Sequence, residues 1–469
     1  MRQGFSVLAG PGFISGRTDG PACRNHPAVA GKGRSNGKSQ LSLNTGERSP
    51  FAPGVRNMLD QFVDNETLRR SADLLQRIED AQANPACDES LPATLPDIGI
   101  GNDQTLAVLA PLILGAARQL GDPGFFAHMD PPVPSIAAAL SFWNASLNQN
   151  VLHPDTAPIA REIEERLIRW LAPLFGMVAG HMVPGSTIAN LEALWMAREL
   201  RGVREVVASR ASHLSLQKAA GILGLSFRAV ETDHRQRLRP EFLGDLSQSA
   251  LVLTAGTTAA GAIDPLGVGQ TAAWRHVDAA WGGPLCFSSL HSHLLSGLEN
   301  ADSVAVSAHK LLFQPKDSAL LLVADRSALD AVTFGSAYLR APNIGLMGSS
   351  GARAVPLLAT LLAFGKQGMA SIIDHCMSLA QELALRIERS GDFELFDAPQ
   401  SGCVLWRSRR VATDRLARAI RNACVSTAEI DGDLWLRSVA ANPFASPSHV
   451  YDSVQEAVSS LTTPSAADR

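Results

Sequence analysis

Residues 301–310 read ADSVAVSAHK, and this stretch indicates the fold that the chain is expected to adopt. Between Ser303 and Ser307 polar and apolar residues alternate, which is typical of a short, largely buried strand. The strand ends in a turn that carries Lys310. Upstream, residues 276–283 read HVDAAWGG, a second short strand that ends at Asp278. The two segments therefore predict an amine and a carboxylate at the ends of two strands.

A lysine that can form a Schiff base and an acid that can hold a pyridinium nitrogen are the minimal requirements of pyridoxal phosphate chemistry. Each residue also has an ordinary interpretation. A lysine after a strand is usually a solvated charge, and an aspartate there is usually a turn or cap residue. The pair, with each residue on its own strand, is more specific than either residue alone and predicts a site for this cofactor.

Strands and helices alternate around this pair, which predicts an α/β fold with a mostly parallel sheet and helices on both faces. The ligand site of such a fold lies at the carboxyl ends of the strands. Gly185, His213, Thr254, Asp278 and Lys310 all fall at or just past predicted strand ends. The predicted strands cover residues 204–209, 227–230, 251–255, 276–278, 303–307 and 319–324, with helices at 212–223 and 241–248.

Two further segments suit a flat, phosphorylated ligand. A Gly-Ser-Thr turn at residues 185–187 leads into a helix predicted at 191–200, and free backbone N–H groups at a helix start can bind phosphate. Ser and Thr are also the usual N-caps, so the turn alone is weak evidence. Residues 254–264, TAGTTAAGAID, form a turn of small residues that would let a ligand approach closely or would simply connect a strand to a helix.

Four regions are expected along the chain. Residues 1–55 lack periodicity and are rich in Gly, Ser and Pro, which predicts a disordered tail. Residues 56–120 form a helical arm with helices at 58–83 and 105–120, and residues 121–345 form the large α/β domain. Residues 346–469 contain a long helix at 354–390 and a small α+β domain, with strands at 393–396, 403–406 and 434–439 and helices at 414–422 and 448–461.

A loop region precedes the main α/β pattern and flanks a helix predicted at 135–147. It contains His128 and Asn150, which would line a substrate pocket if the loops close over the site. An ordinary interdomain connection explains the composition equally well. No Arg or Lys lies between residues 125 and 153, so this region offers no cation for a second substrate carboxylate.

Composition limits the classes of function. The chain has 469 residues, 46% hydrophobic and 18% charged, and its net charge of −4 argues against nucleic acid or an acidic membrane surface as a partner. The six cysteines include no CxxC pair and no Cys/His cluster at metal-ligand spacing, which favours reduced thiols in a cytoplasmic protein without a metal. The apolar runs near residues 106–117 and 355–364 are shorter than the roughly 18–20 residues of a membrane span.

The motifs together resemble the group II pyridoxal phosphate-dependent decarboxylases, which include glutamate, aromatic amino acid, cysteine sulfinate and diaminobutyrate decarboxylases. The matching segments run from Gly121 to Asn442 in the order of the family: the GST turn, TAGTTAAGAID, HVDAAWGG, SAHK and LRSVAANP. The resemblance implies fold type I of the pyridoxal phosphate enzymes, the aspartate aminotransferase-like fold. It also implies a homodimer with its sites at the subunit interface.

The resemblance assigns roles to individual residues. Lys310 would hold pyridoxal 5'-phosphate as a Schiff base, and Asp278 would pair with the pyridinium nitrogen. His213 would stack on one face of the ring and Ala280 would pack against the other. The remaining assignments are Gly185, Ser186, Ser307 and more weakly Thr187 at the phosphate, His309 before the lysine, Thr258 near a cofactor oxygen, and Arg437 at the substrate α-carboxylate.

Two departures from the family pattern affect these roles. Pro184 stands before the phosphate turn, where many relatives have a small residue. The segment between Lys310 and the turn at residues 348–350 is shorter than in the animal enzymes, which carry there a mobile loop with a tyrosine that protonates the carbanion. Tyr338 is the nearby tyrosine in this chain, so either Tyr338 or a histidine donates the proton, or the reaction is not simple decarboxylation.

The expected function is therefore decarboxylation of an L-amino acid to its amine and carbon dioxide. Another reaction of the same cofactor remains an alternative: aminotransfer, carbon–carbon lysis or decarboxylation-dependent oxidative deamination. A non-catalytic homologue is a third, less favoured hypothesis, because Lys310 and Asp278 are both present. The substrate itself is not specified by the sequence.

Overall fold

This computed structural model describes residues 65–76, 91–337 and 339–463. The chain divides into two units, Met1–Ala116 and Ala117–Arg469, and each is described by itself. The tail predicted at residues 1–55 and the predicted proton donor Tyr338 lie outside the described residues.

The described residues of the first unit contain two helices, α2 (Asn65–Gln76) and α4 (Asn102–Ala116). Helix α2 falls within the helix expected at 58–83, and α4 overlaps the helix expected at 105–120 but begins three residues before it. Arg70 on α2 forms an ion pair with Asp103 on α4, which joins the two helices. The contact is exposed and contributes little to stability by itself.

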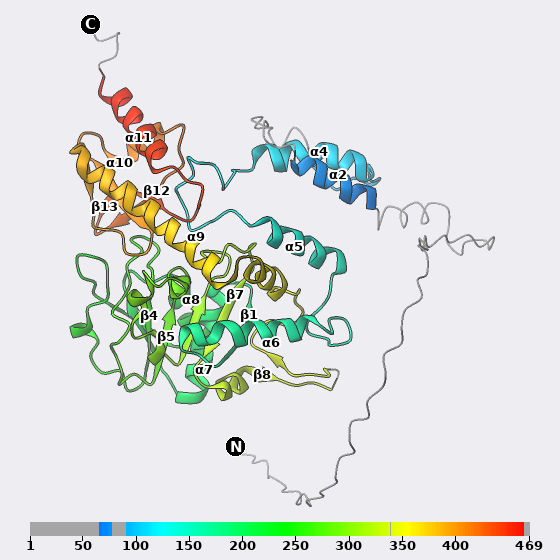
Figure 1. Ribbon diagram of the computed structural model, residues 1–469. Coiled ribbons are helices and arrows are strands. Elements are labelled where there is room, and N and C mark those ends of the chain that lie inside the picture. The colour runs from blue at the N-terminus through cyan, green and yellow to red at the C-terminus, as the bar shows by residue number, and fades with distance from the viewer. Residues whose placement is uncertain (1–64, 77–90, 338, 464–469) are drawn as a thin grey trace, which may run out of the picture. The chain divides into compact units, whose positions relative to one another are not determined.

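The second unit is built on a seven-stranded sheet with the order β1-β7-β6-β5-β4-β2-β3 (Figure 1). Strands β2 to β6 run parallel to one another, whereas β7 is antiparallel to both β6 and β1. The mostly parallel sheet expected from the sequence is therefore confirmed. The strands are β1 (Ala179–Val183), β2 (Glu205–Ser209), β3 (Ser226–Val230), β4 (Ser249–Thr254), β5 (Trp274–Asp278), β6 (Ser303–Val306) and β7 (Ala319–Val323).

The sheet is buried on both faces because alternate residues of a strand point to opposite sides. On β7, Leu320 and Leu322 belong to one hydrophobic core, while Leu321 belongs to the other. The core that contains Leu321 is closed by α7 (Ser186–Arg201) and α8 (Ser215–Leu223). The larger core includes residues of α6 (Ala160–Leu171) and α9 (Ala354–Ser390) and continues into the C-terminal region.

A smaller antiparallel sheet of four strands forms the C-terminal part, in the order β10-β11-β13-β12. The sequence predicted this small α+β region after a long helix. That helix, α9, has the predicted bounds and is kinked at Gly365. Its elements are β10 (Phe393–Leu395), β11 (Cys403–Ser408), α10 (Thr413–Ala419), β12 (Ser426–Ile430), β13 (Asp433–Val439) and α11 (Pro447–Thr462). A separate hairpin joins β8 (Thr333–Phe334) to β9 (Asn343–Ile344), and α5 (Ser135–Leu147) has the predicted bounds.

Three expectations about secondary structure were wrong. The helix predicted at 241–248 is a single 3-10 turn, Pro240–Phe242, because Gly244 adopts a left-handed conformation that ends it. Strands β1 and β12 were not expected. Helix α7 begins at Ser186, five residues before the predicted start, so the hydroxyl residues of the Gly-Ser-Thr turn belong to its first turn.

Helix α9 is the one helix among the described residues that is long and apolar enough to cross a membrane. Its side chains Leu357, Ile373 and Leu383 are buried in the larger core. The non-helical backbone at Gly365 also interrupts it. We therefore regard α9 as a core helix of this unit.

Candidate active site

The strand ends of the main sheet surround a cavity of about 210 Å³. Lys310 follows β6, Asp278 ends β5, and Gly185 follows β1. Because parallel strands bring their carboxyl ends to one edge, residues far apart in sequence meet there. The lining consists of Gly185, Ser186, Thr187, Asn190, His213, Thr254, Gly256, Thr258, Asp278, Ala280, Ser307, His309 and Lys310, which includes all ten residues expected to contact the cofactor.

Lys310 and Asp278 are the charged pair of this cavity. Burial lowers the pKa of Lys310, although the nearby Asp278 acts in the opposite direction. A lowered pKa increases the fraction of neutral amine, which is the form that attacks a carbonyl. Asp278 is 4% exposed, and its two carboxylate oxygens accept hydrogen bonds from Ala280 N and Asn190 Nδ2. The carboxylate is thus held in one orientation.

Two hydroxyl groups that line the cavity lie together. Ser186 Oγ, in the first turn of α7, is 2.7 Å from Ser307 Oγ, which follows β6. The N-terminus of this 16-residue helix carries unpaired N–H groups and the positive end of the helix dipole. The arrangement suits a phosphate group.

His213 borders the same cavity and is held by its own turn. Its Nδ1 atom is 2.8 Å from Ser215 Oγ and also accepts a hydrogen bond from Ser215 N. Burial lowers the pKa of His213, Lys310 and Lys218 lower it further, and Asp278 acts in the opposite direction. The ring is therefore neutral at pH 7.

Buried polar atoms without partners provide a test of whether a ligand fits. Thr254 Oγ1 and His309 Nδ1 are both buried, and neither has a hydrogen-bond partner among the described residues. Burial, Lys316 and Lys310 lower the pKa of His309 to about 4, so its ring is neutral as well. Unsatisfied buried polar groups are costly, and both of these residues line the cavity. A polar ligand there would satisfy them, and the residues present fit pyridoxal phosphate.

Arg437 does not line this cavity but borders a neighbouring one. On β13 it is 6% exposed, its Nε donates to Thr258 O, and its Nη1 donates to Ala127 O. It borders an open cavity of about 460 Å³ that shares Thr258 with the first. The other terminal nitrogen, Nη2, is the part of the side chain that would meet a carboxylate.

The two loop residues expected to bind substrate are placed elsewhere. His128 is exposed and does not line the cavity that contains Lys310. Asn150 donates to Ser349 Oγ and accepts from Leu152 N, so its side chain connects two loops. The structure of this chain therefore does not bring either residue to Lys310.

Sequence reasoning missed two residues that support the site. Asn190 on α7 lines the cavity and donates to Asp278 Oδ2 at 2.9 Å. Asp264 is buried and accepts hydrogen bonds from Leu238 N and Thr254 N, which fixes the end of β4. A polar residue on the buried face of a helix could have signalled Asn190, but its partner depends on tertiary contacts.

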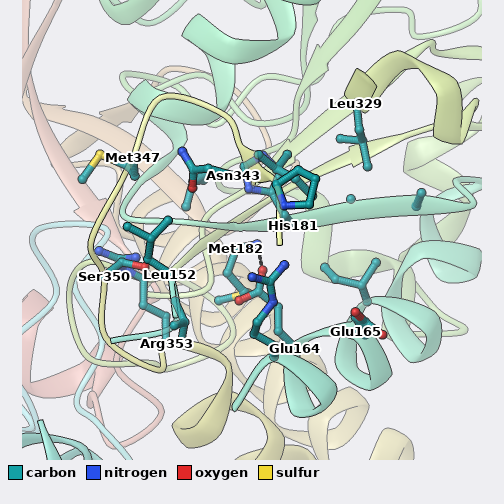
Figure 2. A pocket seen from close by; sticks show the side chains of 18 of the residues that line it. Leu152, Glu164, Glu165, His181, Met182, Leu329, Asn343, Met347, Ser350 and Arg353 are labelled. Carbon is teal, nitrogen blue, oxygen red and sulfur yellow. Dashed lines mark hydrogen bonds between the residues drawn. The ribbon is translucent and has the colours of Figure 1, made fainter. Parts of the chain in front are cut away.

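A further cavity of about 200 Å³ lies on the outer side of the edge strand β1 (Figure 2). His181 and Glu164 face it, and Glu164 accepts a hydrogen bond from Met182 N. His181 Nε2 lies 2.8 Å from the buried carboxylate of Glu192, which accepts a hydrogen bond from Leu346 N. This cluster attaches the segment after β9 to β1 and contains none of the residues around Lys310.

The comparisons with known proteins agree with this geometry. Residues 87–409 match the model of the pyridoxal-dependent decarboxylase conserved domain. The L-2,4-diaminobutyrate decarboxylase of Rhizobium meliloti is 31% identical over 79% of this chain and 84% of that protein. The human cysteine sulfinic acid decarboxylase is 33% identical over 60% of this chain and 66% of that protein.

Solved structures give the same fold. The Oryza sativa TDC, determined with PLP and tryptamine, superimposes with a TM-score of 0.77 over 89% of this chain and all of that one, at 20% identity. At this identity the likeness concerns the fold, which is fold type I as expected. The match to the family model and the similarity to curated decarboxylases carry the activity and its cofactor, pyridoxal 5'-phosphate. The chain therefore belongs to the family of pyridoxal phosphate-dependent amino acid decarboxylases.

Proposed function

We propose that Lys310, Asp278 and His213 are the catalytic residues of this decarboxylase and that its substrate is a small L-amino acid with a second amino group. The convergence of these three side chains on one cavity is the observation that carries the assignment of the residues. Pyridoxal phosphate, when bound, supplies an electron sink for the electron pair left by the departing carboxylate.

Each residue has a separate task. The amine of Lys310, whose pKa burial lowers, would hold the cofactor covalently and be displaced by the substrate amine. Asp278 would hold a proton on the pyridine nitrogen through its fixed carboxylate. His213 would cover one face of the ring, and Ser186 with Ser307 would bind the phosphate. The roles of Gly185, Thr187, Thr258, Ala280 and His309 as further contacts stay predictions.

The orientation of the substrate falls to Arg437. Decarboxylation requires the bond to the carboxylate to stand perpendicular to the ring, which is a positioning task. Because Nε and Nη1 of Arg437 are committed to backbone carbonyls, the guanidinium is fixed and Nη2 would bind the α-carboxylate. Tyr338 remains a candidate proton donor from the sequence.

The preference for a second amino group has two supports. The relative that matches over 84% of its length decarboxylates L-2,4-diaminobutyrate by its name. In addition, Glu429 and Asp431 line the open cavity beside Arg437 and Thr258, and Asp431 is already paired with Arg210. Glu429 would therefore be the acceptor for a distal ammonium group.

A panel of amino acids tests the assignment. We expect carbon dioxide and the corresponding amine from L-2,4-diaminobutyrate, with weaker turnover of L-aspartate, L-cysteine sulfinate and L-tryptophan. Glu429→Gln should raise KM for the diamino acid, whereas the exposed control Glu388→Gln should not. Preferred turnover of an acidic or aromatic substrate would refute the substrate class. A ketoacid product without carbon dioxide would refute decarboxylation.

We also infer a homodimer. Exposed apolar side chains gather on α5 and the first half of α9, two helices that pack against each other. Phe142 and Trp143 are 48% and 58% exposed, and Leu362 is 66% exposed. Such a patch favours a protein interface. Light scattering of the purified protein should give twice the chain mass, and Trp143→Glu should lower it. A cytoplasmic location stays a prediction of the sequence.

A further inference from the structure

A chain of buried polar side chains runs beneath the cavity, from the middle of the sheet to Asp278. It consists of Trp274 and His276 on β5, Ser303 on β6, Asn190 on α7 and Ser215 on α8. Each of these five residues is at most 2% exposed. Successive polar atoms are 2.9 to 3.0 Å apart, so every link is a normal hydrogen bond.

The direction of the hydrogen bonds follows from the two ends of the chain. The indole N–H of Trp274 can only donate, so Ser303 Oγ accepts from it. At the other end Asn190 Nδ2 donates to Asp278 Oδ2, which places the amide oxygen Oδ1 against His276 Nε2, 3.0 Å away. Burial lowers the pKa of His276 to about 4, so the ring is neutral, and its single hydrogen lies on Nε2, where Oδ1 accepts it. His276 Nδ1 then accepts from Ser303 Oγ.

The amide of Asn190 also donates hydrogen bonds to two residues, Asp278 and Ser215. With Oδ1 toward His276, its Nδ2 donates one hydrogen to Asp278 Oδ2 and the other to Ser215 Oγ. The reverse orientation would place the amide oxygen against the carboxylate and the amide N–H against the histidine N–H. Independently of this amide, the backbone N–H of Ser215 donates to His213 Nδ1, which leaves the hydrogen of His213 on Nε2.

We propose that Asn190, oriented by His276, is a positioning residue that holds the carboxylate of Asp278 in the orientation needed at the pyridine nitrogen. His276 does not line the cavity, so it acts through Asn190. This inference rests on the proposed role of Asp278.

Isosteric variants of Asn190 test the proposal. In Asn190→Asp two carboxyl groups face each other at hydrogen-bond distance, so they share a proton. We expect a loss of at least about tenfold in the affinity of the apoprotein for pyridoxal phosphate at pH 7, recovering as the pH rises. Asn190→Leu, which adds no carboxyl group, should lose affinity without the recovery at high pH. His276→Leu should resemble Asn190→Leu, and His276→Gln, which can still donate to Asn190, should restore most of the affinity.

A second measurement does not depend on the cofactor. ¹⁵N NMR of histidine-labelled apoprotein should show His276 protonated on Nε2, and Asn190→Leu, which removes the acceptor of that hydrogen, should produce a mixture of His276 tautomers. Asn442→Leu is the control, because Asn442 is equally buried but donates to Asp122 O and Phe125 O. It should lower Tm without changing the pH dependence of cofactor binding.

Two results would overturn the proposal. One is that Asn190→Asp and Asn190→Leu lose the same affinity with the same pH dependence. The other is that His276 carries its hydrogen on Nδ1 in the unchanged protein. If instead the unchanged protein does not bind pyridoxal phosphate, the proposed roles of Lys310 and Asp278 fail, and that outcome is distinct from either of these.

Discussion

Replacing Asp264 with Asn should change how the stability of this protein depends on pH. Asp264 is 2% exposed, and its carboxylate accepts hydrogen bonds from Leu238 N at 2.7 Å and from Thr254 N at 2.8 Å. Burial outweighs these bonds and raises its pKa from the ordinary value of 3.8 to about 6. No arginine or lysine among the described residues forms an ion pair with it.

The size of the effect follows from the difference between the pKa of Asp264 in the folded state and its ordinary value. A pKa raised in the folded state stabilises the fold fully below the unfolded value and loses that stabilisation as the pH rises through the folded value. From 3.8 to about 6, at about 1.4 kcal/mol per pH unit, the free energy of unfolding should fall by about 3 kcal/mol. Asp264→Asn lacks this loss because the amide does not ionise.

Urea unfolding of both proteins at several pH values between 4 and 7 measures the effect. The amide of Asn has one oxygen and loses one of the two N–H contacts at every pH. The quantity to follow is therefore how the difference in the free energy of unfolding between the two proteins changes with pH. We expect the advantage of the unchanged protein to shrink by about 2.5 kcal/mol over this range. The control Asp245→Asn should show the opposite sign, since Ser247 holds the pKa of Asp245 below its usual value. A difference between unchanged and Asp264→Asn proteins that is independent of pH would refute the reasoning.

Three further predictions concern the phosphate residues and the cluster of His181 and Glu192. Gly345→Ala should lower the free energy of unfolding by about 2–4 kcal/mol, because φ is +75° and the added Cβ would lie 2.5 Å from Glu192 Oε1; thermal melting checks this, with Gly348→Ala, which has open space, as the control. Ser307→Ala should weaken pyridoxal phosphate binding by about 1 kcal/mol, or about fivefold, because Ser186 loses its partner and the phosphate one donor; unchanged affinity in a titration of the apoprotein would contradict the phosphate role. Burial lowers the pKa of His181, but the carboxylate of Glu192 outweighs burial and raises this pKa above 6.5. The pair therefore stabilises the fold at low pH, and this stabilisation is lost as the pH rises through the pKa of the folded state. Melting curves of His181→Gln should show a smaller loss of stability above pH 6.5 than those of the unchanged protein.

The site could be predicted from the sequence because its residues follow strands. Lys310, Asp278 and His213 come directly after apolar or alternating segments, and parallel strands bring such positions to one edge of the sheet. The resemblance to the decarboxylases then supplied the roles. The cavity confirms that these residues meet, while the roles themselves stay predictions until tested.

Other features depend on contacts that no local pattern records. Strand β1 contains Gly180 and is followed by Pro184, and neither residue type favours a strand. The strand forms because it pairs with β7, and Gly180 is required there since a Cβ would lie 2.2 Å from Leu321 O. Asn190 was missed because its function depends on three partners from other elements. His128 and Asn150 lie in loops without periodicity, so their position relative to Lys310 was not fixed by any pattern.

The most direct test of the account is the cofactor linkage at Lys310. The purified protein, loaded with pyridoxal phosphate, should show visible absorption that borohydride abolishes, and the reduced cofactor should be recovered on the peptide that contains Lys310. The protein should also release carbon dioxide from one amino acid. Lys310→Ala should show neither this absorption nor the release of carbon dioxide. Reduction that labels another lysine, or full activity of Lys310→Ala, would contradict the account.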